Sequence, residues 1–351
     1  MLRRPLSVLC ASILIAGCAT TNLSFPNATP GKPLTVPAWE LRPTGPGPFP
    51  AVVLLHGCAG ISKSNHEWSR WFRDQGYVAL LVDSWTPRRI GPSCSPDLPD
   101  VPNTERFDDA IGALRFLQAK PYVDRARVGV VGWSNGGVFA LAVVNGPSLE
   151  RARRRGVVLP EPGFRASIAF YPGGCYSLVQ ELVVRPLLVM IGDADDWIDP
   201  GPCVEMIEAM RRRGADARIV LYPRAYHYFD VIGQERTYLA EVANHNKPNE
   251  CCGATVAFDA RAFADSRRRA DDDTVAQRRD RQQLDIVGEH KVAPTSCVGC
   301  GCEPLSDCHG VVVEAARKAA ARARMARAGR GVLVPARKVD RGLGEAGRRG
   351  H

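Results

Sequence analysis

The sequence lacks a hydrophobic run that could hold the protein permanently across a membrane. A spanning helix needs about 20 consecutive apolar residues, and the apolar segment Leu6–Ala16 near the start of the chain is shorter than that. The apolar and charged fractions, 45% and 24%, are those of a globular protein and not of a disordered one. We therefore expect one domain of about 200–250 residues with extensions, or two smaller domains.

A basic face is lacking as well. The formal net charge is +9, but residues 291–351 hold twelve Lys or Arg and five Asp or Glu, so +7 of that charge lies there. The rest of the chain is near neutral, which argues against a nucleic-acid partner. The cysteine-rich segment Cys297–His309 also lacks the two separated ligand pairs of a structural zinc site. No metal is expected.

The first residues have the features of an export signal. Two arginines precede the apolar segment, which ends in IAGC at residues 15–18. This ending resembles the lipobox of bacterial lipoproteins, in which the signal peptide is cut before the cysteine and the cysteine carries the lipid. We expect residues 1–17 to be removed, Cys18 to be lipidated and residues 18–34 to form a polar tether, with the protein anchored to the membrane and facing the periplasm. An ordinary secretory signal with an incidental cysteine is the alternative.

Export changes how the twelve cysteines are interpreted. Ten remain once Cys10 leaves with the signal peptide and Cys18 is lipidated. In an oxidising compartment some of these ten are expected to form disulfides. The sequence does not give their pairing.

Short apolar segments alternate with helical patterns through the middle of the chain. Such alternation is typical of a parallel sheet with helices on both faces. We predict an α/β domain over residues 35–288, followed by a loosely ordered tail at 289–351. One helix is expected at 104–118, with Thr104 as a candidate N-cap. The other expected helices are 135–144 and 202–213, and the expected strands are 51–55, 77–82, 128–131, 167–171, 187–191 and 218–222.

The segment GWSNG, residues 132–136, is the strongest candidate for chemistry. It follows an apolar run and precedes a helical pattern, which is the context of a G-x-S-x-G nucleophile elbow. In such an elbow the backbone at the serine is strained, and the flanking glycines remove side chains that would clash. We interpret Ser134 as a nucleophile; the alternative is a small residue that fills a structural turn.

A serine nucleophile of this kind needs an acid and a base later in the chain. His227 follows the last expected strand and is the candidate base, with His245 as the second choice. Four aspartates, at positions 193, 195, 196 and 199, follow the strand 187–191. We predict that Asp195 orients the histidine, with Asp196 as the alternative, and that the others serve turns and caps.

The first expected strand ends in HGCAG, residues 56–60. A glycine-rich turn at this place can aim a backbone N–H group at a developing oxyanion. We expect the N–H groups of Cys58 and Asn135 to form the oxyanion hole, and His56 to be a structural hydrogen-bonding residue. The Cys58 thiol is either free or part of a disulfide.

HGCAG, GWSNGG, GDADDW and YPRAYHYFD, in this order and spacing, resemble the motifs of the dienelactone hydrolase family of α/β-hydrolases. The resemblance runs from about residue 48 to residue 269. It implies the α/β-hydrolase fold, a mostly parallel sheet with helices on both faces, with Ser134, Asp195 and His227 as the catalytic triad.

Two positions depart from that family. Its nucleophile is a cysteine, whereas this chain has Ser134. Its substrate carboxylate is bound by an arginine four residues after the histidine, a position that Val231 occupies here. Arg88 or Arg89 could meet an anion instead, although exposed arginines are more often solvated.

These patterns predict a monomeric serine hydrolase that cleaves a carboxylic ester or lactone through an acyl-enzyme and needs no cofactor. The rivals are a peptidase or acyltransferase on the same triad, and a catalytically inactive envelope protein that binds a ligand. The enzyme requires Ser134 and His227 within reach of a hydrogen bond, which is often looser when no ligand is bound.

Overall fold

The computed structural model describes residues 20–91, 94, 103–244, 246 and 252–273. The chain divides into two units, residues 1–289 and 290–351, and all described residues belong to the first. The expected signal peptide, the lipidation site Cys18, the tail at 289–351 and the second-choice base His245 lie outside the described residues, so they stay predictions.

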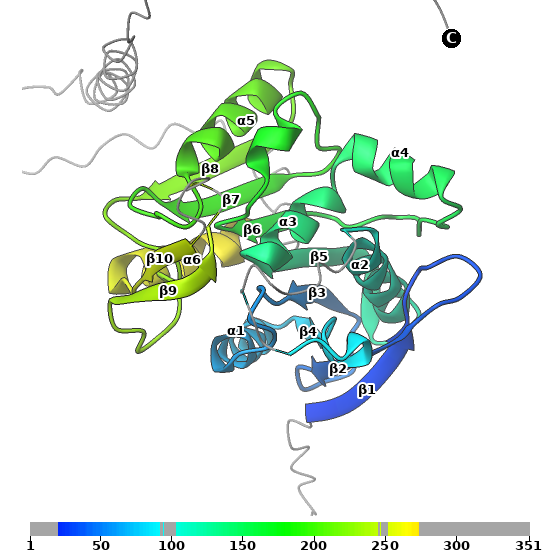
Figure 1. Cartoon of the computed structure of the whole chain (residues 1–351). Helices are drawn as coiled ribbons and strands as arrows, with labels where there is room; N and C mark the ends of the chain where they lie inside the picture. Colours follow the sequence, from blue (N-terminus) through cyan, green and yellow to red (C-terminus); the bar gives the residue numbers. More distant parts are fainter. Residues whose placement is uncertain (1–19, 92–93, 95–102, 245, 247–251, 274–351) are drawn as a thin grey trace, which may run out of the picture. The chain divides into compact units, whose positions relative to one another are not determined.

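An eight-stranded sheet forms the centre of the described unit (Figure 1). Its strands are β1 (Thr20–Pro26), β2 (Thr35–Leu41), β3 (Phe49–Leu55), β4 (Val78–Val82), β5 (Val123–Trp133), β6 (Ser167–Phe170), β7 (Leu187–Gly192) and β8 (Ala217–Tyr222). They lie in the order β1-β2-β4-β3-β5-β6-β7-β8. The six strands β3 to β8 run parallel, and β1 and β2 are antiparallel to their neighbours. The prediction of a mostly parallel α/β sheet is confirmed.

Helices connect the parallel strands and cover the sheet. Every residue of β4 and of β7 is buried, which requires helices on both faces. The helices are α1 (Lys63–Asp74), α2 (Asn103–Gln118), α3 (Asn135–Ala142), α4 (Gly146–Arg154), α5 (Pro200–Arg212) and α6 (Ala260–Asp273), with short 3₁₀ turns at η1 (Thr86–Arg88) and η2 (Cys175–Leu178). None of the helices among the described residues is long and apolar enough to cross a membrane.

The strands and helices expected from the sequence are all present, with ends that differ by a few residues. One detail is wrong. Helix α2 begins at Asn103, so Thr104 lies inside the helix and is not its N-cap. The strongly periodic apolar segments were therefore sufficient to locate the elements that carry the candidate site.

The polar segment expected to be a tether forms strand β1 and its connection to β2, so that prediction is wrong for residues 20–34. β1 pairs with β2 along its whole length. The side chain of Phe25 is buried, and Asn27 donates from Nδ2 to Asp109 Oδ1 at 3.0 Å. The physical reason is an alternation hidden by the polar composition, because Leu23 and Phe25 pack against the core at a spacing of two residues.

A small second sheet, which was not expected from the sequence, lies in the connection between β8 and α6. Its strands are β9 (Thr237–Ala243) and β10 (Cys252–Val256). Val256 forms a bridge to His227, and the N–H of Ala257 donates to the His227 carbonyl at 3.0 Å. This hairpin therefore supports the segment that carries His227.

Disulfides cross-link the described unit. Cys58 is bonded to Cys94, and Cys175 is bonded to Cys203. Cys252 is also in a disulfide. The Cys58 thiol is therefore not free, which decides between the two alternatives that the sequence leaves open.

Candidate active site

Ser134 occupies the sharp turn between β5 and α3. Its φ of 51° and ψ of −116° lie in a region that residues other than glycine rarely adopt. The turn is held by the Ser134 N–H, which donates to the Phe170 carbonyl at 2.9 Å. The N-terminus of α3 follows directly and favours negative charge nearby. This is the backbone geometry of a nucleophile elbow.

Close backbone contacts require the two glycines that flank the serine. A Cβ on Gly132 would lie 2.1 Å from the Gly136 carbonyl oxygen, and a Cβ on Gly136 would lie 2.1 Å from the Leu55 carbonyl oxygen. Neither position has room for a side chain. The two glycines of the motif are therefore required because side chains would clash there. The contact of Gly136 with Leu55 also places the end of β3 against the elbow.

The four aspartates after β7 have different partners. Asp195 Oδ2 lies 2.8 Å from His227 Nδ1, and its Oδ1 accepts two backbone N–H groups of its own loop. Asp196 instead accepts the backbone N–H and the hydroxyl of Thr255. The remaining two accept backbone N–H groups, of a turn in the case of Asp193 and of the start of α5 in the case of Asp199. The structure thus brings Asp195, and not Asp196, to the histidine.

His227 is fully buried in the segment that follows β8. Its ring lies 4.2 Å from the ring of Tyr171 and 4.7 Å from that of Trp197, centroid to centroid. Since Asp195 accepts at Nδ1, that nitrogen carries the proton and Nε2 keeps its lone pair. Nε2 is buried and has no hydrogen-bond partner among the described residues. It is therefore available to accept a proton.

The end of β6 joins Ser134 to His227. Phe170 accepts the Ser134 N–H, and the next residue, Tyr171, packs its ring on the imidazole. In the described part of the chain no direct hydrogen bond links the serine to the histidine, a contact that is often long in enzymes without ligand. The structure thus pairs Asp195 with His227 directly and places Ser134 in the neighbouring turn.

Both expected oxyanion donors lie next to the elbow. A Cβ on Gly57 would lie 3.6 Å from Ser134 Cβ, so the turn after β3 runs alongside the serine. Cys58 follows in that turn and is fixed by its disulfide and by Trp85, whose Nε1 donates to the Cys58 carbonyl at 2.8 Å. Asn135 is the first residue of α3, where backbone N–H groups have no partner within the helix.

Arg106 on α2, a residue not expected from the sequence to belong to the site, links the two segments that carry these donors. One terminal nitrogen of its buried guanidinium donates to the His56 carbonyl at 2.7 Å, and the other donates to the side-chain oxygen of Asn135. The group also stacks over the rings of Trp85 and Phe139. Burial lowers the pKa of Arg106 to about 9. A charged residue within the apolar pattern of α2 is the signal that could have found it.

His56 is structural, as the sequence suggests. The Ser84 N–H donates to its Nε2 at 3.2 Å, so Nδ1 carries the proton and donates to the Gly57 carbonyl at 2.7 Å. Burial, together with the positive charge of Arg106, lowers the pKa of His56 well below its ordinary value. A neutral ring with both nitrogens engaged does not serve as the base for Ser134.

Arg88 is not available to bind an anionic substrate. Its guanidinium contacts Glu105 at 2.6 Å and Asp109 at 2.9 Å. It also donates to the Ser84 carbonyl at 2.7 Å. The suggestion that this residue meets an anion is therefore not supported, whereas Arg89 is exposed. Among the described residues, no group of three or more His, Cys, Asp or Glu side chains is placed to hold a metal ion.

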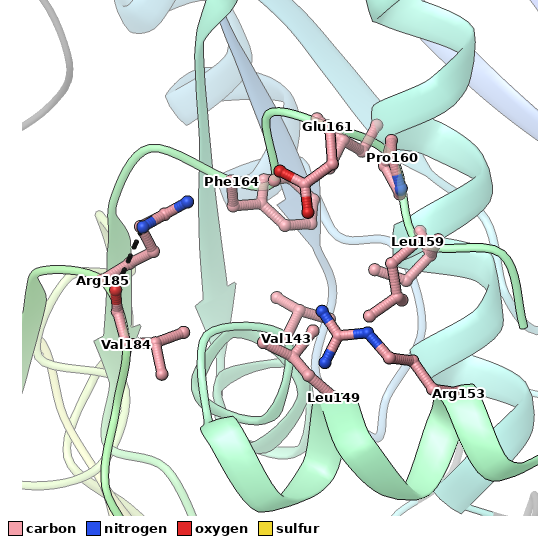
Figure 2. Close-up of a pocket in the computed structure, with 12 residues that line it drawn as sticks. Val143, Leu149, Arg153, Leu159, Pro160, Glu161, Phe164, Val184 and Arg185 are labelled. Carbon is pink, nitrogen blue, oxygen red and sulfur yellow. Dashed lines mark hydrogen bonds between the residues drawn. The ribbon is translucent and has the colours of Figure 1, made fainter.

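A separate hollow lies near the amino ends of β6 and β7 (Figure 2). It is lined mainly by apolar side chains of α2, of α4 and of the segments that lead into β6 and β7. Arg153 and Glu161 point into it (Figure 2). The candidate active site follows the carboxyl ends of β5, β7 and β8, so this hollow is not part of it.

Comparisons with known proteins concern the family and the fold of the chain. The model of the dienelactone hydrolase family matches residues 36–249. A Bradyrhizobium protein named as a probable 2-oxo-3-(5-oxofuran-2-ylidene)propanoate lactonase is 24% identical over 217 residues, which cover 55% of this chain and 78% of that protein.

Solved structures share the fold. A Klebsiella pneumoniae protein assigned as a dienelactone hydrolase superposes with a TM-score of 0.51 at 19% identity, over 72% of this chain and 97% of that one. A dienelactone hydrolase-like promiscuous phosphotriesterase from metagenomic libraries gives a TM-score of 0.50 at 19% identity, over 73% of this chain and 97% of that one.

Proposed function

The chain belongs to the dienelactone hydrolase family, and from this premise we propose that it is a serine hydrolase that cleaves a carboxylic ester or lactone through an acyl-enzyme. That the protein is a hydrolase of ester bonds follows from the family; the nucleophile and the mechanism are the proposal. The observation that carries it is the buried 2.8 Å contact of Asp195 with His227, beside a serine held at a φ of 51°. Buried acid–base pairs and strained residues cluster at active sites.

In the first half-reaction, Ser134 Oγ attacks the substrate carbonyl carbon while its proton passes to His227 Nε2. Asp195 holds the imidazole in the required tautomer and stabilises the imidazolium. The backbone N–H groups of Cys58 and Asn135 stabilise the negative charge on the carbonyl oxygen. When the tetrahedral intermediate collapses, the imidazolium gives its proton to the departing alkoxide, and the acyl group stays on Ser134.

In the second half-reaction, a water molecule attacks the acyl carbon while His227 Nε2 takes its proton. The bond to Ser134 Oγ then breaks, and the proton returns from the imidazolium to that oxygen. The carboxylic acid leaves and the free enzyme is restored. For a lactone the same steps apply, except that the leaving hydroxyl remains part of the product.

The test is hydrolysis of short-chain p-nitrophenyl esters and of simple lactones by the full-length protein. Ser134→Ala is expected to abolish turnover of both, because it removes the attacking oxygen. Ser148→Ala, which alters a serine on α4, is the matched control and is expected to keep the parent rate. A fluorophosphonate probe followed by mass spectrometry locates the reactive serine directly.

Labelling at Ser134 together with loss of activity in Ser134→Ala supports the proposal. If Ser134→Ala retains the parent activity, the assignment of the nucleophile is wrong. If the parent hydrolyses neither esters nor lactones and the probe leaves Ser134 unlabelled, a ligand-binding protein without catalysis is the better description.

We also propose that the protein is exported and anchored through a lipid on Cys18. The IAGC pattern at residues 15–18 supports the anchor. The bonds Cys58–Cys94 and Cys175–Cys203 support an oxidising compartment, since stable disulfides are rare in reducing ones.

Metabolic labelling with an alkyne-bearing fatty acid tests the anchor in a bacterial host that makes the full-length chain. The parent is expected to take up the label and to fractionate with membranes, and Cys18→Ser is expected to lose both properties. Cys10→Ser, which changes the other cysteine near the start of the chain, is the control and should behave like the parent. A labelled, membrane-bound Cys18→Ser protein would contradict the proposal.

A further inference from the structure

Asp230 is a buried carboxylate that the mechanism above does not use. It is 1% exposed and lies three residues after His227 in the same loop. Its Oδ2 accepts the indole N–H groups of Trp68 at 2.9 Å and Trp133 at 2.7 Å. Its Oδ1 accepts the hydroxyl of Tyr171 at 2.6 Å.

Two of these donors connect Asp230 to the candidate nucleophile Ser134 and to the candidate base His227. Trp133 is the residue immediately before Ser134, so its bond to Asp230 ties the loop of the base to the elbow. Tyr171 packs its ring 4.2 Å from the imidazole of His227 and has a φ of 37°, which is uncommon for a residue other than glycine. The hydroxyl bond to Asp230 holds that ring where it supports the base.

Three hydrogen bonds compensate the burial of the Asp230 carboxylate. A carboxylate buried without compensation costs several kcal/mol, and three hydrogen bonds to the charged form offset that cost. Burial raises the pKa of Asp230, while the bonds from Tyr171, Trp68 and Trp133 oppose the rise. Burial and the charge of Asp230 raise the pKa of Tyr171 well above its ordinary value, so the tyrosine stays a neutral donor.

We propose that Asp230 is a positioning residue, which fixes His227 relative to Ser134 by binding Trp133 and Tyr171 at once. The inference rests on the proposed function, because it concerns the geometry of that triad. Ser134 and His227 are not joined by a hydrogen bond of their own, so their relative placement depends on the groups around them. In enzymes a displacement of about 1 Å can lower the rate about 100-fold.

Two conservative variants test the proposal in the full-length protein. Asp230→Asn keeps the size of the side chain and one accepting oxygen, but it removes the charge. Its kcat is expected to fall about 10- to 100-fold while KM changes less than about threefold, since the substrate-binding surface is intact. Tyr171→Phe removes one hydroxyl and is expected to lower kcat in the same way, by about tenfold. Both substitutions disturb the same hydrogen bond between Tyr171 and Asp230. The kcat of the double variant should therefore be little lower than that of Asp230→Asn alone.

A second tyrosine–carboxylate hydrogen bond serves as the control that distinguishes an effect on kcat from a general loss of stability. Tyr122 donates its hydroxyl to Glu40 at 2.8 Å, which is the same kind of bond, at the ends of the strands opposite the active site. Tyr122→Phe and Glu40→Gln should lower the midpoint of thermal unfolding yet keep kcat within about twofold of the parent. All rates are measured at a temperature where circular dichroism shows each protein to be folded.

The outcomes separate this inference from the proposed function. Folded Asp230→Asn and Tyr171→Phe proteins with the parent kcat, alongside an inactive Ser134→Ala, would overturn the positioning role alone. If Asp230→Asn does not fold, Tyr171→Phe decides, since it removes a single oxygen atom. A parent protein with neither ester turnover nor fluorophosphonate labelling would overturn the proposed function, and the positioning role with it.

Discussion

Asp195 Oδ2 and His227 Nδ1 lie 2.8 Å apart, and neither side chain is exposed to solvent. Four aspartates follow β7 within seven residues, yet only this one reaches the imidazole. The neighbouring Asp196 faces the hairpin and binds Thr255. Two adjacent carboxylates of the same chemistry thus have different partners.

Asp195→Asn is expected to lower kcat by about 10³- to 10⁴-fold, because an amide at this place favours the wrong tautomer of the imidazole. Asp196→Asn is expected to weaken the hairpin, lowering the free energy of unfolding by about 1–2 kcal/mol, with a change in kcat of less than about tenfold. Steady-state kinetics and chemical denaturation of the two variants check both statements. If Asp196→Asn lowers kcat much more than Asp195→Asn does, Asp196 is the acid of the triad.

The buried imidazole of His56 makes the stability of the fold depend on pH. Its pKa is lowered in the folded protein by burial and by the charge of Arg106, so below about pH 6.5 the unfolded chain binds a proton that the folded protein does not. The free energy of unfolding is therefore expected to fall as the pH decreases from 7 to 5, by up to about 1.4 kcal/mol per unit from this group.

His56→Gln is expected to remove most of that dependence, although it lowers stability at neutral pH. His66→Gln is the control. The pKa of His66 is also lowered by burial, but this residue is only partly buried, so its contribution to the slope is smaller. Urea denaturation at several pH values measures the slope, and an unchanged slope in His56→Gln would contradict the explanation.

Arg106 should matter for both stability and rate, since it bonds to the His56 carbonyl and the Asn135 side chain at the same time. Arg106→Met leaves buried acceptors without partners and is expected to lower the free energy of unfolding by about 1–3 kcal/mol. Arg106→Lys keeps the charge but lacks the fork that reaches both acceptors. Both variants should lower kcat/KM, by about tenfold or more, and a folded Arg106→Lys protein with the parent kcat/KM would show that the link has no catalytic effect.

The bond between Cys58 and Cys94 is expected to support catalysis as well as folding. It closes a loop of 36 residues, so replacing both cysteines by serine should lower the free energy of unfolding by about 3–4 kcal/mol. The turn after β3 would also lose one of the attachments that fix Cys58, and kcat should fall because the Cys58 N–H then faces the oxyanion less accurately. Replacing Cys175 and Cys203 gives the comparison, with a similar loss of stability and a smaller effect on kcat. Equal kcat values in the two double variants would argue against the oxyanion role of Cys58.

The six parallel strands of the central sheet could be predicted because their signals are local, whereas the antiparallel strands β1 and β2 were not predicted. A buried parallel strand is a short apolar run, and six such runs were found in the sequence. Helix α1 was missed since its sequence, KSNHEWSRWFRD, is mostly polar, although Trp68 and Phe72 are fully buried. β1 was missed for the same reason, because among its residues with described side chains, 22–26, Leu23 and Phe25 are the ones that pack against the core. In both cases tertiary packing buries a narrow apolar face that composition does not reveal.

The candidate triad could be proposed because a G-x-S-x-G elbow restricts the chain order of its partners. Sequence placed Ser134, Asp195 and His227 by order and by position after strands, which are one-dimensional properties. The residues that hold the triad in place could not be predicted in this way. Arg106 comes from α2 and Asp230 contacts residues 97 and 162 positions away, and no local pattern marks such contacts.

The sequence by itself determined the α/β class, the elbow at Ser134 and the order of the residues that can act with it, because strand periodicity and glycine sterics depend on near neighbours. Only the tertiary structure decided that Asp195 and not Asp196 meets His227, that Cys58 is bonded to Cys94, and that Asp230 joins the base to the elbow. Those outcomes depend on which side chains the folded sheet brings within about 3 Å of one another, and that distance is a property of the whole fold.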